Sequence, residues 1–318
     1  MAFLRLRKDY ESTDRRLGLL LVTPVVLLIA LVMLVPLFDA ISTSFTNLRV
    51  PGSPYEFVGL EQYSKLIQDP QFRGSLGRTL IWIIANGVLQ LVLATIAAVA
   101  LNQAFRGANI IRAWIILPWV VPVAVTAILW RWMLDATSGG VNWALQSTGI
   151  IDKPILFLSD PENAFPTLIA MNSWRFFPFL TILLLAAMQM IPRSQFEAAS
   201  MDGASVFRQF WTITFAHLRP ILAVLGLVGT LWSANIFDLI WLTTRGGPGG
   251  RTETLPLFVY ETAFAGFNFS LAAAASGLFL IFLMMLAIPL GVNARKELGK
   301  APSEGMLRGN TKKGGQTS

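Results

Sequence analysis

The chain has 318 residues, 54% hydrophobic and only 14% charged, with a mean hydropathy of +0.59 and a formal net charge of +7. Soluble domains carry about 25% charged residues, so the composition indicates a membrane protein with several spans, whose basic excess flanks those spans. The absence of cysteine excludes disulfides and thiolate metal sites, and the single histidine, His217, argues against histidine-based metal or triad chemistry.

Six apolar runs are long enough to cross the roughly 30 Å hydrocarbon core of a membrane, which takes about 20 helical residues. In chain order these predicted spans are Leu17–Phe38, Thr79–Leu101, Ala113–Trp130, Phe165–Ile191, Ile221–Phe237 and Leu271–Val292. Prolines lie inside several of them, among these Pro24, Pro118, Pro122 and Pro178, and we expect neighbouring helices to satisfy the carbonyl groups that these prolines free. The sequence therefore predicts an all-α membrane protein with six transmembrane helices, formed by residues 17–295.

The distribution of lysine and arginine predicts the orientation of these spans. Most of the lysine and arginine residues lie in the N-terminal segment, in the loops after the second and fourth spans, and in the tail. Because basic residues favour the cytoplasmic side, both termini are expected there. Residues 1–16 then form a cytoplasmic N-terminus, and the polar residues 296–318 are expected to be a disordered cytoplasmic tail.

A polar interruption at residues 192–219 stands between the fourth and fifth spans, and its centre reads FEAASMDGASVFRQF. Ser194 and Glu197 have the spacing of a capping box at a helix start. Gly203 accepts the positive φ of a helix end, and Asp202 could cap a second helix, Ala204–Phe210. This pattern predicts a helix-turn-helix knob that suits docking to a soluble partner, or else an amphipathic helix resting on lipid headgroups.

The run EAASMDGASVFRQFWTITFAHLRP closely resembles the EAA loop of ABC-importer permeases. The matching positions are Glu197, Ala198, Ala199, Asp202, Gly203, Ala204, Phe210, Ile213 and Pro220. The sequence departs from the family pattern at Ala216, where a proline is usual. The segments FVGLEQYSKLIQDPQF, NSWRFFPF and NIFDLIWLTTRGGPGG resemble the maltose-type sugar-importer branch. The resemblance extends from Arg15 to about Arg295.

This resemblance implies the fold of type I ABC-importer permeases and a transport subunit rather than an enzyme. It implies a bacterial or archaeal cytoplasmic membrane and a knob that docks on an ATPase through Glu197, Ala198, Ala199, Asp202 and Gly203. The implied partners are a second homologous permease, two ATPase subunits, an extracytoplasmic solute-binding protein, a sugar and membrane lipid, and no nucleic acid. No cofactor is expected in this chain: it has no G-x-x-x-x-G-K-[ST] phosphate loop, and ATP and Mg²⁺ belong to the ATPase subunits. No metal site is expected.

Polar groups inside spans are costly and are therefore functional candidates. The resemblance places the predicted substrate pathway at Asn172, Arg175, Phe179, Ser233 and Asn235, because amides and hydroxyls suit sugar hydroxyls and aromatic rings suit the faces of pyranoses. An alternative is that the polar side chains bond to neighbouring helices.

Charged side chains near the spans leave further alternatives open. Arg175 either recognises an anionic group of the substrate or pairs structurally with a carboxylate or backbone carbonyl of the second permease. Asp238 and Arg131 lie near the outer ends of their spans and could pair. The run Gly246–Gly250 reads as a flexible external turn, which in the family lies close to the docked binding protein.

Other classes of protein remain as rivals. An intramembrane protease would need histidine with serine or glutamate at membrane depth, and a secondary carrier usually needs intramembrane carboxylates; neither pattern is present in the predicted span centres. Within ABC importers, the alternative substrates are glycerol phosphate, a sugar acid, a polyamine or an amino acid.

Overall fold

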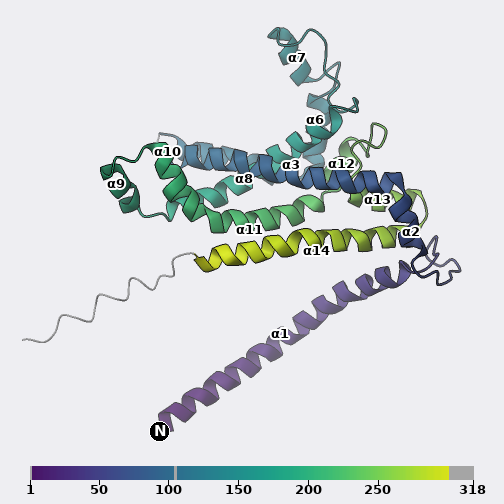
Figure 1. Cartoon of the computed structure of the whole chain (residues 1–318), viewed down its shortest axis with the longest axis horizontal. Helices are drawn as coiled ribbons and strands as arrows, with labels where there is room; N and C mark the ends of the chain where they lie inside the picture. Colours follow the sequence, from purple (N-terminus) through teal and green to yellow (C-terminus); the bar gives the residue numbers. More distant parts are fainter. Residues whose placement is uncertain (1, 104–105, 301–318) are drawn as a thin grey trace, which may run out of the picture. The chain divides into compact units, whose positions relative to one another are not determined.

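The computed structural model describes residues 2–103 and 106–300, which are predominantly helical (Figure 1). The chain divides into two compact units, Met1–Asp69 with Val259–Leu278, and Pro70–Phe258 with Phe279–Ser318. The predicted cytoplasmic N-terminus falls in the first part of helix α1, which begins at Ala2. The predicted tail lies outside the described residues from position 301 onward, and before that the last helix continues to Lys300.

The first unit joins the end of α1 to the start of the last helix. Its elements are α1 (Ala2–Thr43), α2 (Glu61–Gln68), the π-helical turn η2 (Glu261–Ala265) and the beginning of α14 (Phe269–Lys300). The loop after α1 ties them together: the hydroxyls of Thr46 and Ser270 lie 2.9 Å apart, and Gln62 donates to the carbonyl of Thr46 at 3.0 Å. These bonds fix the loop at the ends of the two long helices.

The second unit contains the functional candidates. Its elements are α3 (Pro70–Leu101), α4 (Ala108–Ile115), α5 (Leu117–Val120), α6 (Val123–Met133), α7 (Gly140–Ser147), α8 (Ala164–Gln189), α9 (Arg193–Met201), α10 (Val206–Gln209), the π-helical turn η1 (Phe210–Thr214), α11 (Phe215–Ala234), α12 (Asp238–Thr243), most of α13 (Leu255–Tyr260) and α14 from Phe279 onward. Helices α3, α8 and α11 run side by side in Figure 1 and pack on one another.

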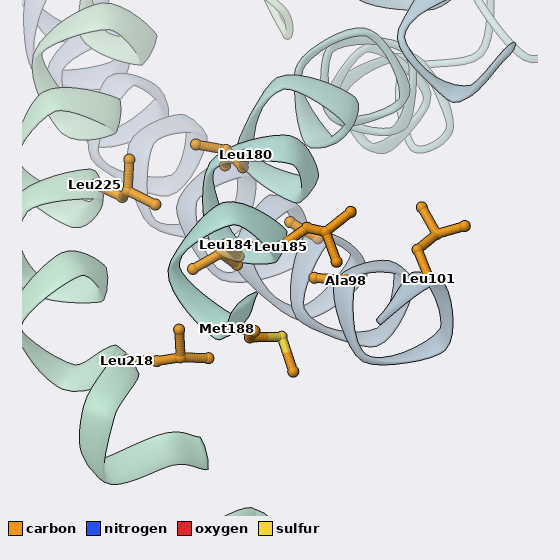
Figure 2. Close-up of a cluster of buried hydrophobic side chains, with 9 residues drawn as sticks. Ala98, Leu101, Leu180, Leu184, Leu185, Met188, Leu218 and Leu225 are labelled. Atoms are coloured by element: carbon orange, nitrogen blue, oxygen red, sulfur yellow. The ribbon is translucent and has the colours of Figure 1, made fainter. Parts of the chain in front are cut away.

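One apolar cluster holds these three long helices together, with Leu184 and Leu218 fully buried (Figure 2). Figure 2 shows Leu180 and Leu184 of α8 between Leu225 of α11 and Ala98 of α3. Small residues such as Ala98 let helix backbones approach closely, which favours packing in a membrane, where lipid is as apolar as leucine.

A second apolar cluster holds the short helices α12 and α13 against the other end of α3 and α8. Leu239 and Ile240 of α12 and Leu257 of α13 pack with Trp82 of α3 and Leu168 of α8. The two clusters thus fix both ends of the α3–α8 pair.

Among the described residues, five helices are long and apolar enough to span a membrane, in the ranges Leu20–Thr43, Pro70–Leu101, Ala164–Gln189, Val206–Ala234 and Phe269–Gly299. They match five of the six predicted spans. The sixth predicted span, Ala113–Trp130, corresponds to α4–α5 and α6, which meet at a bend of 95° and form a broken span or a re-entrant loop. Val121 is extended, with ψ 129°, because the ring of Pro122 disfavours the helical conformation of the preceding residue.

Candidate functional site

The polar interruption after the fourth span folds as two short helices joined by a turn, as the sequence predicts. Helix α9 contains Glu197, Ala198 and Ala199, and it ends before Gly203, whose φ is +74°. No atom outside its immediate neighbours lies within 4 Å of the position where a Cβ of residue 203 would be. The requirement for glycine here is therefore conformational rather than steric.

Both predicted helix caps are wrong. Helix α9 starts one residue after Pro192, so Ser194 lies inside its first turn and makes no capping hydrogen bond. Asp202 ends α9 instead of starting α10. The cap of α10 is Ser205, whose hydroxyl accepts a hydrogen bond from the backbone N–H of Arg208 at 3.3 Å, as serine does at helix starts.

This knob, residues 193–209, exposes apolar side chains. Met201 is 89% exposed, Val206 83% and Phe207 74%, and Glu197 and Ala198 are exposed beside them. Neighbouring exposed apolar side chains of this size mark interaction surfaces. The knob therefore has the chemistry of a docking element.

A π-helical turn and an aromatic group join the knob to α11. Trp211 lies in the turn η1 and contacts the rings of Phe207, Phe210 and Phe215, with centroid distances of 6.2, 5.3 and 4.9 Å. The helix continues without a break from Val206 into the span. The knob is thus continuous with α11.

A buried polar cluster lies where α3, α8 and α11 meet, and Asn86 of α3 is its centre. The side-chain oxygen of Asn86 accepts hydrogen bonds from Asn172 at 2.7 Å, Ser173 at 3.2 Å and Gln90 at 3.2 Å. Asn86 is fully buried, and its own amide donates to the carbonyl of Trp82. The side-chain N–H group of Asn172 is therefore bonded to a neighbouring helix. This is the alternative that the sequence left open for its polar side chains.

Two polar atoms at the edge of this cluster have no partner in the described structure. They are the side-chain oxygens of Asn172 and Ser233, and both residues line a cavity of about 30 Å³ with Gln90 and Phe179. That volume holds a water molecule, whereas ligand pockets occupy about 300–1,000 Å³. The cavity is closed to a sugar in this conformation.

Aromatic rings form the other wall of the cavity. Phe179 stacks on Trp119 of α5 with centroids 4.8 Å apart and an interplanar angle of 17°, and it lies 5.8 Å from the ring of Trp232. Phe176 and Trp232 also line the cavity. Stacked aromatic rings beside unpaired hydroxyl and amide oxygens have the composition of a carbohydrate contact.

Of the five predicted pathway residues, the structure brings Asn172, Phe179 and Ser233 to one cavity. Arg175 lies next to them on α8, half-buried, with its guanidinium 4.8 Å from the ring of Phe176 and its Nε without a partner. Asn235 is exposed after the end of α11 and donates to the carbonyl of Leu231.

The predicted pairing of Arg131 with Asp238 is not formed. Arg131 donates to the backbone carbonyl of Leu242 at 3.3 Å, and Asp238 acts electrostatically on Arg175 instead. Arg175 thus has a carboxylate neighbour within its own chain, whereas the structural pairing left open from the sequence is with the second permease and stays a prediction.

Sequence reasoning missed the residues that organise these contacts. Asn86 and Gln90 are polar residues inside a predicted span, and that signal alone could have found them. Glu253, which is only 2% exposed, accepts hydrogen bonds from Gln71 at 2.9 Å and Ser75 at 3.1 Å. Its burial follows from the fold of its loop onto α3 and has no local pattern.

Residues 90–292 match the family described as binding-protein-dependent transport system inner membrane component. A probable ABC transporter permease protein of Brucella suis is 34% identical over 89% of this chain and 99% of its own length. The trehalose/maltose transport system permease protein MalF of Thermococcus litoralis is 31% identical over 90% of this chain and 95% of its own.

The solved structures show the same fold. A chain of a bacterial alginate ABC transporter, solved in complex with an alginate pentasaccharide-bound periplasmic protein, superposes with a TM-score of 0.79 at 21% identity, covering 94% of this chain and 100% of that one. The fold and these matches agree. The chain belongs to the binding-protein-dependent transport system inner membrane components, the multi-pass permease subunits of ABC importers.

Proposed function

We propose that this chain is the permease subunit of an ATP-driven importer for a di- or oligosaccharide or a related carbohydrate. It forms the translocation pathway with a second homologous permease, two ATPase subunits supply ATP hydrolysis, and an extracytoplasmic solute-binding protein delivers the sugar. The full-length similarity to the trehalose/maltose permease supports the substrate class. The exposed knob, residues 193–209, carries the proposal, because a self-sufficient carrier has no use for such a docking element.

A related anionic solute, such as glycerol phosphate or a sugar acid, is a second candidate. The observation that favours it is Arg175, whose Nε lacks a partner beside the cavity. Its proximity to Asp238 favours the neutral sugar, since that carboxylate already offsets the charge. Nothing in the described cavity lining supplies the several carboxylates that would suit a polyamine.

The proposed orientation puts both termini and the knob in the cytoplasm of a bacterial or archaeal cell, with the protein in the cytoplasmic membrane. The positions of lysine and arginine support it. The knob lies between α8 and α11, at the end opposite to α12, so the segments around α12 and α6 then face outward.

In this proposal the knob is the coupling element. Glu197, Ala198, Ala199, Asp202 and Gly203 seat in a groove of the ATPase subunit, where the two alanines allow close approach. Closure of the ATPase dimer moves the knob, and the continuous helix from Val206 carries that movement into α11.

The moving helix opens the pathway. Ser233 lies on α11, and Asn172, Arg175 and Phe179 lie on α8, so a shift between these helices enlarges the cavity that is closed here. The unpaired oxygens of Asn172 and Ser233 then meet sugar hydroxyls, and Asn235 lines the outer approach.

A substitution series at Gly203 tests the coupling role. Asparagine tolerates a positive φ better than alanine does, and a β-branched valine tolerates it least. ATP hydrolysis stimulated by the loaded binding protein should therefore be reduced least in Gly203→Asn, more in Gly203→Ala and most in Gly203→Val. The valine variant should lose most of the stimulation.

Assembly of the complex and hydrolysis without binding protein serve as controls for this series. Full stimulation in the Gly203→Val complex would show that the knob does not couple the ATPase to transport.

A further inference from the structure

The hydrogen bonds of the buried polar cluster fix the direction in which its amide groups point. Trp82, Asn86 and Gln90 follow one another at intervals of four residues, so they lie on one face of α3. The side-chain NH₂ group of Asn86 donates to the backbone carbonyl of Trp82 at 2.9 Å. Because a backbone carbonyl can only accept a hydrogen bond, this NH₂ group faces Trp82, and the side-chain oxygen of Asn86 faces the other way.

This orientation of Asn86 sets the orientation of two further amides. Its oxygen accepts hydrogen bonds from the NH₂ groups of Gln90 at 3.2 Å and of Asn172 at 2.7 Å. If either amide turned over, two carbonyl oxygens would meet in a buried site, and a hydrogen bond would be lost there. Gln90 and Asn172 therefore both direct their NH₂ groups at Asn86, and their oxygens are left for other partners.

Neither of these two oxygens has a partner in the described part of the chain. The oxygen of Asn172 is buried without a hydrogen bond, and no described hydrogen bond reaches the oxygen of Gln90, a residue that is only 6% exposed. Both residues line the closed cavity together with Ser233, whose hydroxyl is also unpaired. Helices α3, α8 and α11 thus each bring a side chain with an unbonded oxygen to one cavity.

The remaining lining of the cavity suits the same chemistry. Phe176, Phe179 and Trp232 form an aromatic wall, and the face of an aromatic ring carries partial negative charge. The described lining contains no charged side chain; Arg175, although next to Phe176 in the sequence, is not part of it. Carbonyl oxygens and ring faces both attract hydrogen-bond donors and repel anionic oxygens.

We propose that Gln90 is a further substrate-contacting residue, and that Asn86 is a positioning residue that makes the pathway select the hydroxyl groups of a neutral sugar over an anionic solute. The inference rests on the proposed function and narrows its substrate class. A sugar hydroxyl can donate to a carbonyl oxygen, whereas an ionised carboxylate or sulfonate can only accept. An anionic group at this place would leave the oxygens of Gln90 and Asn172 unpaired and close to its own charge, which is costly in a buried site.

The acceptors on α3 and α8 are fixed relative to each other. The hydrogen bond between Asn86 and Asn172 joins these two helices, and the packing of α3 on α8 holds Gln90 beside it. In the proposed opening of the pathway, α11 shifts and carries Ser233 with it, while Gln90 and Asn172 keep their positions. The cavity thus opens next to a pair of acceptors that are already oriented, which lowers the cost of ordering them when a sugar binds.

The charge of the transported solute is the first test. The complete transporter is purified with its binding protein, and the compound that this protein releases on denaturation is identified by mass spectrometry. We expect a neutral compound rich in hydroxyl groups. An anionic compound would overturn the selection while leaving the importer function intact, whereas a neutral compound without hydroxyl groups would contradict the proposed carbohydrate substrate.

Removal of the Gln90 oxygen is the second test. Gln90→Met keeps the length of the side chain but has no oxygen or N–H group. The transporter is reconstituted with binding protein that has been reloaded with the released compound, and import and ATP hydrolysis are measured together. Stimulated hydrolysis depends on the knob, which is intact, so the number of molecules imported per ATP should fall about three- to tenfold, as expected for one lost hydrogen bond to the substrate.

Gln103→Met is the matched control, since it makes the same change at an exposed position beyond the end of α3 and should leave the number of molecules imported per ATP unchanged. Equal import per ATP in the two variants would overturn the role of Gln90. An equal fall of import and stimulated hydrolysis in Gln90→Met would also overturn it, because the residue would then be structural.

Two substitutions at Asn86 test its positioning role. Asn86→Asp keeps an acceptor for Gln90 and Asn172, and its neutral form, which burial favours, keeps a donor for the carbonyl of Trp82. Asn86→Leu removes both groups. Import per ATP should therefore stay close to that of the wild type in Asn86→Asp and fall about three- to tenfold in Asn86→Leu.

Equal losses of import per ATP in the two Asn86 variants would show that Asn86 does not act by orienting the amides. A wild-type transporter that no loaded binding protein stimulates would instead contradict the proposed function.

Discussion

The knob and the buried polar cluster differ in solvent exposure and in where their contacts lie. The knob, residues 193–209, is exposed, and its two short helices turn at a glycine that no neighbour crowds. The cluster around Asn86 is buried and defined by hydrogen bonds between α3 and α8. The comparison teaches that the knob is shaped for a partner outside the chain, whereas most of the cluster is shaped by the chain itself.

The largest effect on stability is expected at the centre of the cluster. Asn86→Leu removes the acceptor shared by Asn172, Ser173 and Gln90. Buried hydrogen bonds in membrane proteins contribute about 0.6 kcal/mol each on average, so three lost bonds destabilise by about 2 kcal/mol. The thermal midpoint of the purified complex should fall by roughly 4–8 °C.

Asn102→Leu is the matched control for Asn86→Leu, because it makes the same change at an exposed position after the end of the same helix and should leave the midpoint unchanged. Equal midpoints for the two variants would show that the cluster does not hold the helices together.

A smaller effect is expected in the knob. Ser205→Ala removes the hydroxyl that caps α10, and such a loss costs about 1 kcal/mol of local helix stability. The midpoint of the complex should hold while stimulated ATP hydrolysis falls severalfold. Ser205→Asp restores a capping oxygen and should restore stimulation; if the aspartate variant is as impaired as the alanine variant, capping is not the cause.

The smallest effect on stability is expected where a polar atom of the cluster has no hydrogen-bond partner. The hydroxyl of Ser233 has no partner, so Ser233→Ala should change stability by less than about 0.5 kcal/mol. Sugar uptake by the Ser233→Ala transporter at low substrate concentration should nevertheless fall severalfold. This is the fall expected when one hydrogen bond to the sugar, of about 0.5–1.5 kcal/mol, is lost.

Thr230→Val serves for comparison on α11, because the Thr230 hydroxyl bonds to the carbonyl of Gly226 within the helix; its uptake should remain normal. A Ser233→Ala complex with normal uptake would remove Ser233 from the pathway.

The same contrast explains how far the sequence could be read. Five spans follow from apolar length alone, and Gly203 follows from the chemistry of helix ends. The sequence could not show that the third apolar run bends at Val121–Pro122, because prolines are tolerated in many spans when neighbouring helices satisfy the backbone.

The sequence predicts less of the candidate site than of the knob. Asn172, Phe179 and Ser233 were predicted and do share a cavity. Asn86, the hydrogen-bond partner of Asn172, was not singled out, although it lies inside a predicted span. The burial of Glu253 depends on a loop folding onto a helix far away in sequence. Contacts between helices depend on the tertiary structure and cannot be predicted from the sequence pattern of one helix.

The central claim is that the knob is the cytoplasmic element that docks on the ATPase. The chain has no cysteine, so Met201→Cys, at a side chain that is 89% exposed, gives a single reporter. The measurement is the rate of maleimide labelling in inside-out vesicles, with the complete transporter and with the permeases alone, and with Asn102→Cys as the reference. We predict that the ATPase subunits protect position 201 several times more strongly than position 102; equal labelling with and without the ATPase subunits would contradict the account.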